Sequence, residues 1–244
     1  MMNESAVQLG ENFQKYFEMV YAKSDEQKND AFRIRHQVYC EELKYESLHE
    51  DKRETDEYDS DSMHLMLRSK KSGEFIGCTR IICPRLNDPG YQLPIEKICV
   101  SAIDNTIVDL KKIPRNEMAE VSRLAVVANY RRRKSDSKST VSITSADFST
   151  ENEEQRFPYI PVSLYLGTIR LAQINGIEYL LVLTEERLAH HFGKLGFDIQ
   201  LIGKSIEHRG KRVPSMVRIS SSINNMYPSL RSLYLAIVKD IEKA

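Results

Sequence analysis

Charged side chains of both signs recur through the first half of this sequence in a pattern that could support chemistry. An acidic run has the form Glu-x-Asp-x-Tyr-Asp-x-x-Ser-x-His, in which the carboxylates that the pattern names are Glu54, Asp56 and Asp59. Guanidinium groups stand on both sides of it, at Arg33, Arg35, Arg80 and Arg123. Buried charges need partners of opposite sign. If the fold gathers these groups, they can satisfy one another and position an amine and a carboxylate; the alternative is a solvated acidic face.

A second motif lies in the last quarter of the chain, where His190-His191-Phe192-Gly193-Lys194-Leu195-Gly196-Phe197 follows an apolar run. It resembles the closing motif of the GNAT superfamily of N-acyltransferases, in which an aromatic residue and a Gly-Phe pair complete the acyl-donor site. On the residues alone, Gly196 is equally a helix stop before a strand. Phe192 is the candidate aromatic residue.

The order and spacing of the charged set add a closer resemblance. Arg35, Tyr39 and Tyr45, the acidic run, Arg80 and then Glu120-Val121-Ser122-Arg123 resemble the pattern of acyl-homoserine-lactone autoinducer synthases, although that family usually has Phe and Trp at the two tyrosine positions. Closer still are the N-acyl amino acid synthases and the PEP-CTERM/exosortase system-associated acyltransferases, which share Arg-x-x-Val-Tyr-Cys-Glu-Glu. The resemblance covers about residues 30 to 200. It implies a GNAT-like fold and transfer of a fatty acyl group from acyl carrier protein to an amine.

The same resemblance assigns roles to individual residues. An amine must lose a proton to attack a thioester, and a carboxylate can accept it; Glu120 is the candidate base, with Ser122 and Arg123 as its catalytic neighbours. On a regular strand Glu120 and Arg123 point to opposite faces, so both can serve one site only if a bulge intervenes. GNAT proteins commonly have such a bulge, which turns a backbone N–H toward the thioester oxygen. The expected substrate-binding residues are Arg35, Tyr39, Glu54, Asp56, Asp59 and Arg80.

The acyl donor is expected along the same strand and the segment after it. Leu124, Ala125 and Val126 would flank the pantetheine arm. GNAT enzymes that use acetyl-CoA have glycines in the next turn, whose backbone N–H groups close around a pyrophosphate, but here no glycine lies between Gly90 and Gly167. Cations follow instead, at Arg131, Arg132, Arg133 and Lys134. Side-chain cations suit the single phosphate and acidic surface of acyl carrier protein better than CoA; the alternatives are a solvated basic turn or a nucleic-acid patch.

Hydrophobic periodicity predicts the elements that position these residues. The expected order is helices, hairpin, strand, helix, buried strand, helix, hairpin and helix, which is an α/β domain with a central mixed, mostly antiparallel sheet. We expect one domain over 1–244 with a polar insertion at about 131–157 and a C-terminal helix at about 222–243. The expected helices span 9–22, 25–42, 95–100, 161–175 and 187–195, and the expected strands 63–68, 75–83, 119–127, 177–183, 199–206 and 212–219.

Composition limits the remaining classes. The 244 residues carry 35 basic and 35 acidic side chains, which argues against a globally basic nucleic-acid binder. No stretch approaches the about 18 apolar residues of a membrane span, and no signal peptide is evident, so a cytosolic protein is expected. The four cysteines form neither a metal motif nor a disulfide framework, and His190 and His191 are adjacent, so no metal site is expected.

The sequence therefore predicts an N-acyltransferase that makes an N-acyl amino acid or related signal, with an acyl-phosphopantetheine donor and no permanently bound cofactor. Three alternatives stay open. The acceptor could be S-adenosylmethionine, as for a homoserine-lactone synthase; the donor could be CoA, as in an N-acetyltransferase; or the fold could be a non-catalytic module that binds acyl carrier protein.

Overall fold

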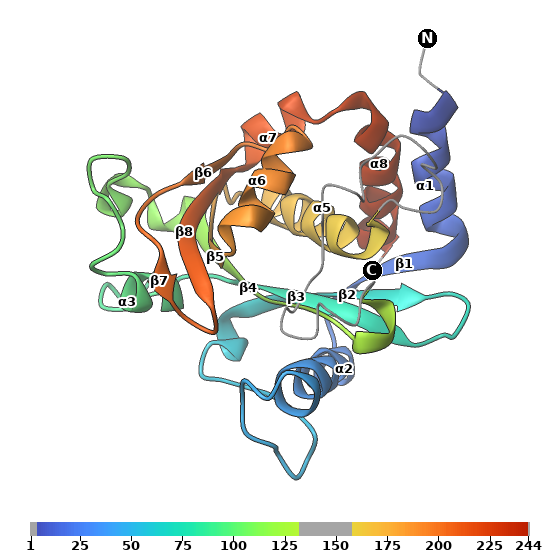
Figure 1. The fold of residues 1–244 in the computed structure, drawn as a ribbon, viewed down its shortest axis with the longest axis horizontal. Coiled ribbons are helices and arrows are strands. Elements are labelled where there is room, and N and C mark those ends of the chain that lie inside the picture. Colours follow the sequence, from blue (N-terminus) through green and yellow to red (C-terminus); the bar gives the residue numbers. More distant parts are fainter. Residues whose placement is uncertain (1–3, 132–157, 244) are drawn as a thin grey trace.

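The computed structural model describes residues 4–131 and 158–243. Its framework is one twisted sheet in the order β1-β2-β3-β4-β5-β8-β6, with the short β7 paired to β8 (Figure 1). All neighbouring strands are antiparallel except β4 and β5. The strands are β1 (Phe17–Ala22), β2 (Ser62–Ser69), β3 (Phe75–Ile82), β4 (Met118–Val126), β5 (Tyr179–Thr184), β6 (Ile199–Leu201), β7 (Ile206–Glu207) and β8 (Lys211–Arg218). The expected mixed, mostly antiparallel sheet is confirmed.

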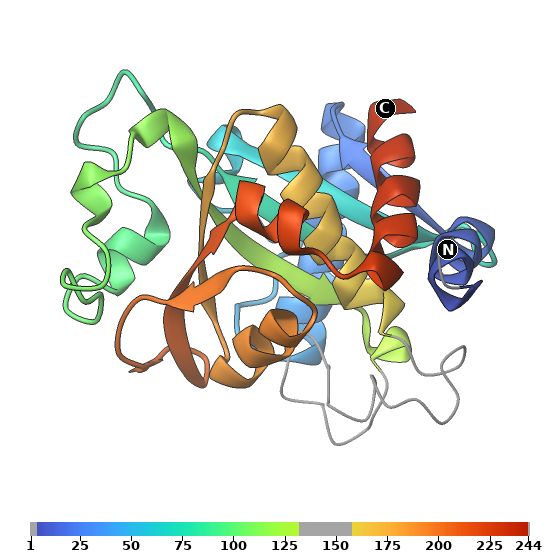
Figure 2. The same ribbon diagram turned by 90° about the horizontal axis from the view of Figure 1, so that it is seen from above.

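Helices cover both faces of this sheet. In Figure 1, α2 lies below the sheet, whereas α5, α6, α7 and α8 lie above it, and Figure 2 shows α5 running across the middle strands. Helix α5 is apolar around most of its circumference because it is packed between the sheet and α8. The helices are α1 (Glu4–Tyr16), α2 (Asp25–Arg35), which continues as a π-helix (His36–Glu42), α3 (Pro94–Ile98), α5 (Tyr159–Ile174), α6 (Glu186–Lys194), α7 (Ile219–Asn225) and α8 (Pro228–Lys243).

The parallel pair at the centre of the sheet opens toward one end. Strands β4 and β5 are paired from Met118 with Tyr179 to Val121 with Val182, and no further. Beyond Val121, β4 stays paired with β3, while β5 stays paired with β8. Because each strand follows its outer neighbour, the two separate and leave a wedge between them. This wedge determines where the candidate site lies.

Three sequence-based predictions of secondary structure were wrong. The expected helix 9–22 ends at Tyr16, and the next six residues form β1, because each of them pairs with a residue of β2. The expected C-terminal helix 222–243 is two helices, since Pro228 cannot continue α7 and instead starts α8. The expected strand 199–206 is interrupted between β6 and β7, where a Cβ on Gly203 would lie only 2.2 Å from the carbonyl oxygen of Ala102.

The other expected elements are present within one to three residues of their predicted limits. The short helix at 95–100, the first hairpin and the strand at 119–127 are among them. The expected insertion at 131–157 lies, except for its first residue, outside the described residues, and the single domain stays a prediction. No helix in the described ranges is long and apolar enough to cross a membrane.

Candidate active site

The strand that carries Glu120 contains the bulge that the sequence argument required. Arg80 on β3 is opposite Ser122, and Cys78 is opposite Ala125, so two residues of β4, Arg123 and Leu124, are opposite Thr79 alone. Arg123 has φ of +54°, which is uncommon for a residue with a side chain. The extra residue resets the alternation of side chains. Glu120, Val121, Ser122, Arg123 and Leu124 all line one cavity, and the expected bulge is confirmed.

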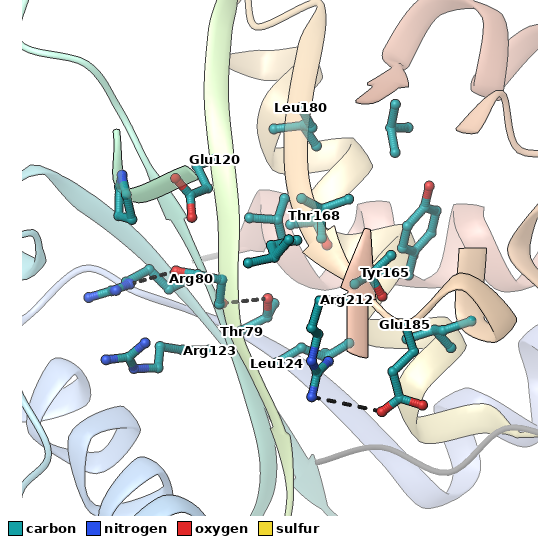
Figure 3. A pocket seen from close by; sticks show the side chains of 18 of the residues that line it. Thr79, Arg80, Glu120, Arg123, Leu124, Tyr165, Thr168, Leu180, Glu185 and Arg212 are labelled. Atoms are coloured by element: carbon teal, nitrogen blue, oxygen red, sulfur yellow. Dashed lines mark hydrogen bonds and ion pairs between the residues drawn. The ribbon is translucent and has the colours of Figure 1, made fainter. Parts of the chain in front are cut away.

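That cavity has a volume of about 310 Å³ and occupies the wedge between β4 and β5. In Figure 3, the polar groups Arg80, Glu120 and Arg123 lie on one side of the β4 ribbon, and Tyr165, Thr168 and Leu180 lie on the other. The second side is largely apolar, with ring and aliphatic carbon from α5, α6 and β5. The cavity therefore joins a charged compartment to an apolar one, and its further apolar lining residues include Ile169, Val182, Leu188, Phe192, Ile199 and Val217.

The charged compartment is backed by a buried ion network. Arg35, from the end of α2, is 1% exposed and contacts two carboxylates: its Nε is 2.5 Å from Glu54 Oε2 and its Nη1 is 2.6 Å from Asp59 Oδ1. Neither Arg35 nor these two acids line the cavity. The structure therefore argues against the direct substrate contact that the sequence suggested for these three, because they lie behind the cavity wall and already hold one another.

Arg80 and Arg123 form the front of the same network. Arg80 Nη1 is 2.6 Å from both Asp56 Oδ1 and Asp59 Oδ1, and its Nε donates to Ser122 Oγ at 3.0 Å. Arg123 Nη2 is 2.9 Å from Glu54 Oε1 and 3.0 Å from Asp56 Oδ2. These two arginines do line the cavity. Their partners occupy most of their hydrogen-bonding positions, so they shape the wall more than they offer donors to a ligand.

The network shifts the acidity of its members in a consistent direction. Burial alone would raise the pKa of Asp59, but Arg35 and Arg80 outweigh it and lower that pKa to about 2. The pKa values of Glu54 and Asp56 are likewise lowered, against burial, by their arginine partners. His64, 1% exposed beside Asp59, has its pKa lowered to about 4, mainly by burial. At neutral pH the acids are therefore charged and the imidazole is neutral.

Glu120 has the opposite behaviour. Its side chain is 4% exposed, and burial raises its pKa to about 8, although a hydrogen bond from the Ile95 N–H and the charge of Arg80 oppose the shift. The Ile95 N–H donates to Glu120 Oε2 at 2.7 Å and so fixes the carboxyl group. A carboxyl group with a pKa near that of an amine, at the wall of a cavity, is suited to exchange a proton with an amine.

Comparisons with known proteins agree with this geometry. Residues 34–139 match the family model described as the acetyltransferase (GNAT) domain. Residues 34–139 are thus recognised as a GNAT domain. The GNAT fold extends well beyond that segment, because solved structures align over most of both chains, and the expectations of a GNAT-like fold and of an acyltransferase are confirmed. No curated protein matches the sequence of this GNAT chain.

Three solved GNAT-fold structures illustrate the similarity. TofI, in a ternary complex with an inhibitor and MTA, has a TM-score of 0.58 at 16% identity, covering 87% of this chain and 99% of its own. BjaI, a CoA-dependent acyl-homoserine lactone synthase with SAM and isopentyl-CoA, has a TM-score of 0.56 at 16% identity. The alignment covers 92% of this chain and 89% of BjaI. FeeM, an N-acyl amino acid synthase from uncultured soil microbes, has a TM-score of 0.55 at 14% identity. The alignment covers 87% of this chain and 96% of FeeM. At these identities, the structures establish the fold.

Within this GNAT fold, the expected donor-binding residues are divided. Leu124 and Phe192 line the cavity, and the Phe192 ring stacks on Tyr165 with centroids 4.1 Å apart. Ala125 and Val126 belong to the hydrophobic core and do not line it, which argues against direct donor contact by these two. Arg132 and Arg133 lie outside the described residues.

The turn after β4 is in contact with a carboxylate of the chain itself. Glu42, at the end of the π-helix, accepts a hydrogen bond from the Ala128 N–H at 3.1 Å and forms an ion pair with Arg131. The first of the cations expected to meet the donor phosphate is therefore paired with a carboxylate of the chain itself. This turn does not line the cavity.

Several cavity residues were missed by sequence reasoning. His208, Arg209 and Arg212 come from the β7–β8 hairpin, and Glu185 from the residue before α6. The hairpin was predicted from the sequence, but its place at the cavity was not, because nothing in the sequence says that its turn lies near β4. Among the described residues, no group of His, Cys, Asp and Glu side chains is placed to hold a metal ion.

Proposed function

We propose that this GNAT chain transfers a fatty acyl group from acyl carrier protein to the amine of an amino acid or related small acceptor. The observation that carries the proposal is Glu120, a buried carboxyl group whose pKa of about 8 matches that of an α-amino group and which lies in a cavity with an apolar arm. The apolar arm, lined by α5, α6 and β5, provides room for an acyl chain.

The chemical step follows from this placement. Glu120, as carboxylate, takes a proton from the acceptor ammonium, directly or through water, and the amine nitrogen attacks the thioester carbonyl. A backbone N–H at the bulge of Arg123 and Leu124 stabilises the resulting oxyanion, a contribution of about 3 kcal/mol in comparable sites. The C–N bond forms and the C–S bond breaks; the attacking nitrogen passes its second proton to the departing thiolate of the pantetheine arm, which leaves as the thiol, and Glu120 releases the first proton to solvent. Arg80 and Ser122 hold β3 and β4 in register beside the reacting groups.

A second candidate is acyl-homoserine-lactone synthesis from S-adenosylmethionine. It is supported by the fold similarity to TofI and BjaI, whose structures contain MTA or SAM. A third possibility is a CoA donor, as in BjaI. The non-catalytic alternative, a module that only binds acyl carrier protein, predicts no acyl amide at all.

One experiment separates these functions. The protein is incubated with acyl carrier protein or CoA loaded with acyl chains of 2 to 16 carbons, together with amino acids and S-adenosylmethionine, and the products are identified by mass spectrometry. We expect N-acyl amino acids from the carrier-bound donor. Lactone products would favour the second candidate. Binding of acyl carrier protein without any acyl amide would contradict the proposed enzyme.

The choice of donor is tested at Glu42. Its carboxylate occupies the turn after β4, so it repels the phosphates of an approaching donor, most strongly those of CoA. Glu42→Gln is expected to lower the KM for acyl-CoA on the order of fivefold, since one screened contact between like charges is worth about 1 kcal/mol, and to lower that for acyl carrier protein less. Glu41→Gln, at the preceding and more exposed position, is the matched control. An unchanged KM for acyl-CoA would remove Glu42 from donor selection.

A further inference from the structure

Arg212 differs from the other arginines of the cavity. It lies at the second position of β8, and Figure 3 shows it beside Glu185, on the opposite side of the β4 ribbon from Arg80 and Arg123. Its side chain is 14% exposed, so most of the guanidinium group is removed from bulk water. It therefore lies on the same side of the β4 ribbon as Tyr165, Thr168 and Leu180.

The guanidinium of Arg212 is poorly satisfied within the described part of the chain. It has five N–H donors, yet its one hydrogen bond there, to the carbonyl oxygen of Arg209, is 3.4 Å long. Its nearest carboxylate oxygen, on Glu185, is 3.8 Å away, beyond hydrogen-bond distance, and that carboxylate lies equally far from Arg187. A largely desolvated cation without a hydrogen-bonded anion is unfavourable.

The three other arginines of the cavity are already matched. Arg80 and Arg123 each contact carboxylates at 3.0 Å or less, and Arg209 forms an ion pair with Glu46. Their carboxylate partners lie within hydrogen-bond distance, whereas the carboxylate of Glu185 lies 3.8 Å from Arg212 and leaves the planar donor edge of Arg212 for a ligand. A carboxylate is the anion that such an edge binds with two parallel hydrogen bonds.

We infer that Arg212 binds the carboxylate of the amine acceptor, which makes this protein selective for α-amino carboxylates over simple amines. The inference rests on the proposed function and names the chemical class of its acceptor. Arg212 also acts on a neighbour in the same wall: the pKa of His208 is lowered first by burial and then by the positive charge of Arg212.

A donor phosphate is the other anion that Arg212 could meet, and the geometry favours the acceptor. Glu46, which holds Arg209 on the adjacent hairpin turn, is also 4.0 Å from Arg123. The hairpin is thereby tied to the charged compartment that contains Glu120. The turn after β4, with Arg131, is where a donor phosphate is expected from the fold, and it lies outside the cavity wall.

The test compares acceptors with and without a carboxylate. Wild type, Arg212→Gln and Arg212→Lys are assayed with free amino acids and S-adenosylmethionine, and with the methyl esters of the same amino acids. Each assay is run with two donors. One is an acyl-N-acetylcysteamine thioester, which has no phosphate, and the other is acyl-loaded acyl carrier protein. Arg212→Gln should raise the KM for free amino acids by about 10- to 100-fold and leave that for the esters unchanged. Arg212→Lys should recover part of the loss.

Arg218→Gln is the matched control, because Arg218 lies on the same strand with an exposed side chain, and thermal unfolding shows whether each variant is folded. Equal use of acids and esters by the wild type would overturn the inference while leaving acyl transfer established. A KM effect of Arg212→Gln confined to acyl carrier protein would assign the residue to the donor and also overturn it. No transfer to any amine would instead contradict the proposed function.

Discussion

Replacing Glu120 with Gln should lower kcat by about 10²- to 10⁴-fold, the range for loss of a positioned general base. Gln keeps the size of the side chain but cannot accept the proton of the acceptor ammonium. Steady-state turnover with the donor and acceptor found by mass spectrometry measures the effect. Binding of acyl carrier protein should persist, because Glu120 lies at the cavity wall, away from the surface that a carrier meets.

The pH dependence tests the same role. Because the carboxylate is the active form and the pKa of Glu120 is raised to about 8, kcat in the wild type should rise with pH and level off above about 8. The raised pKa also contributes stability that is fully present below the ordinary value near 4.5 and is lost as pH rises through 8. Glu120→Gln should remove both dependences. Glu117→Gln, three residues earlier and outside the cavity wall, is the control. Full turnover in Glu120→Gln would exclude Glu120 as the base.

Replacing Arg35 with Met should lower the free energy of unfolding by about 3–5 kcal/mol, the usual effect of removing one partner from a buried ion pair. Glu54 and Asp59 would each lose their contact with Arg35 in an interior where water cannot replace it. Urea unfolding measures the change. Arg33→Met, on the same helix but with a side chain 61% exposed, should change the stability by no more than about 0.5 kcal/mol.

Acid titration gives this prediction a second measurement. The pKa of Asp59 is lowered to about 2, so its stabilising effect is present above its ordinary pKa near 4 and is lost as pH falls toward 2. The difference in stability between wild type and Arg35→Met should therefore narrow between about pH 5 and pH 2. A constant difference over that range would show that the loss comes from packing and not from the unpaired carboxylates.

The sequence indicated the charged groups around this cavity, because the need of buried charges for partners can be inferred from residue types alone. Buried charges must be matched, so Arg35, Arg80 and Arg123 with Glu54, Asp56 and Asp59 could be grouped before any fold was known. The strand around Glu120 was visible as an apolar run, and the need for a bulge followed from the alternation of side chains along that strand.

Other features depend on contacts between segments that are distant in sequence. Residues 17–22 became a strand because β2 offers a free edge, and local periodicity does not report such an edge. Arg212 enters the cavity because β8 pairs with β5. The pairing of Glu42 with Arg131 joins positions 89 residues apart.

The sequence by itself determined which groups this protein has for chemistry: three arginines and three acids that must pair, a carboxyl group on an apolar strand, and a turn without glycine. Only the tertiary structure decided which of them face the cavity. Burial depends on what packs against a residue, so Arg35, Glu54 and Asp59 were placed behind the wall and Glu120 at it. The same packing raised one carboxyl pKa and lowered the other three, because burial outweighs the nearby charges only where no arginine contacts the carboxylate.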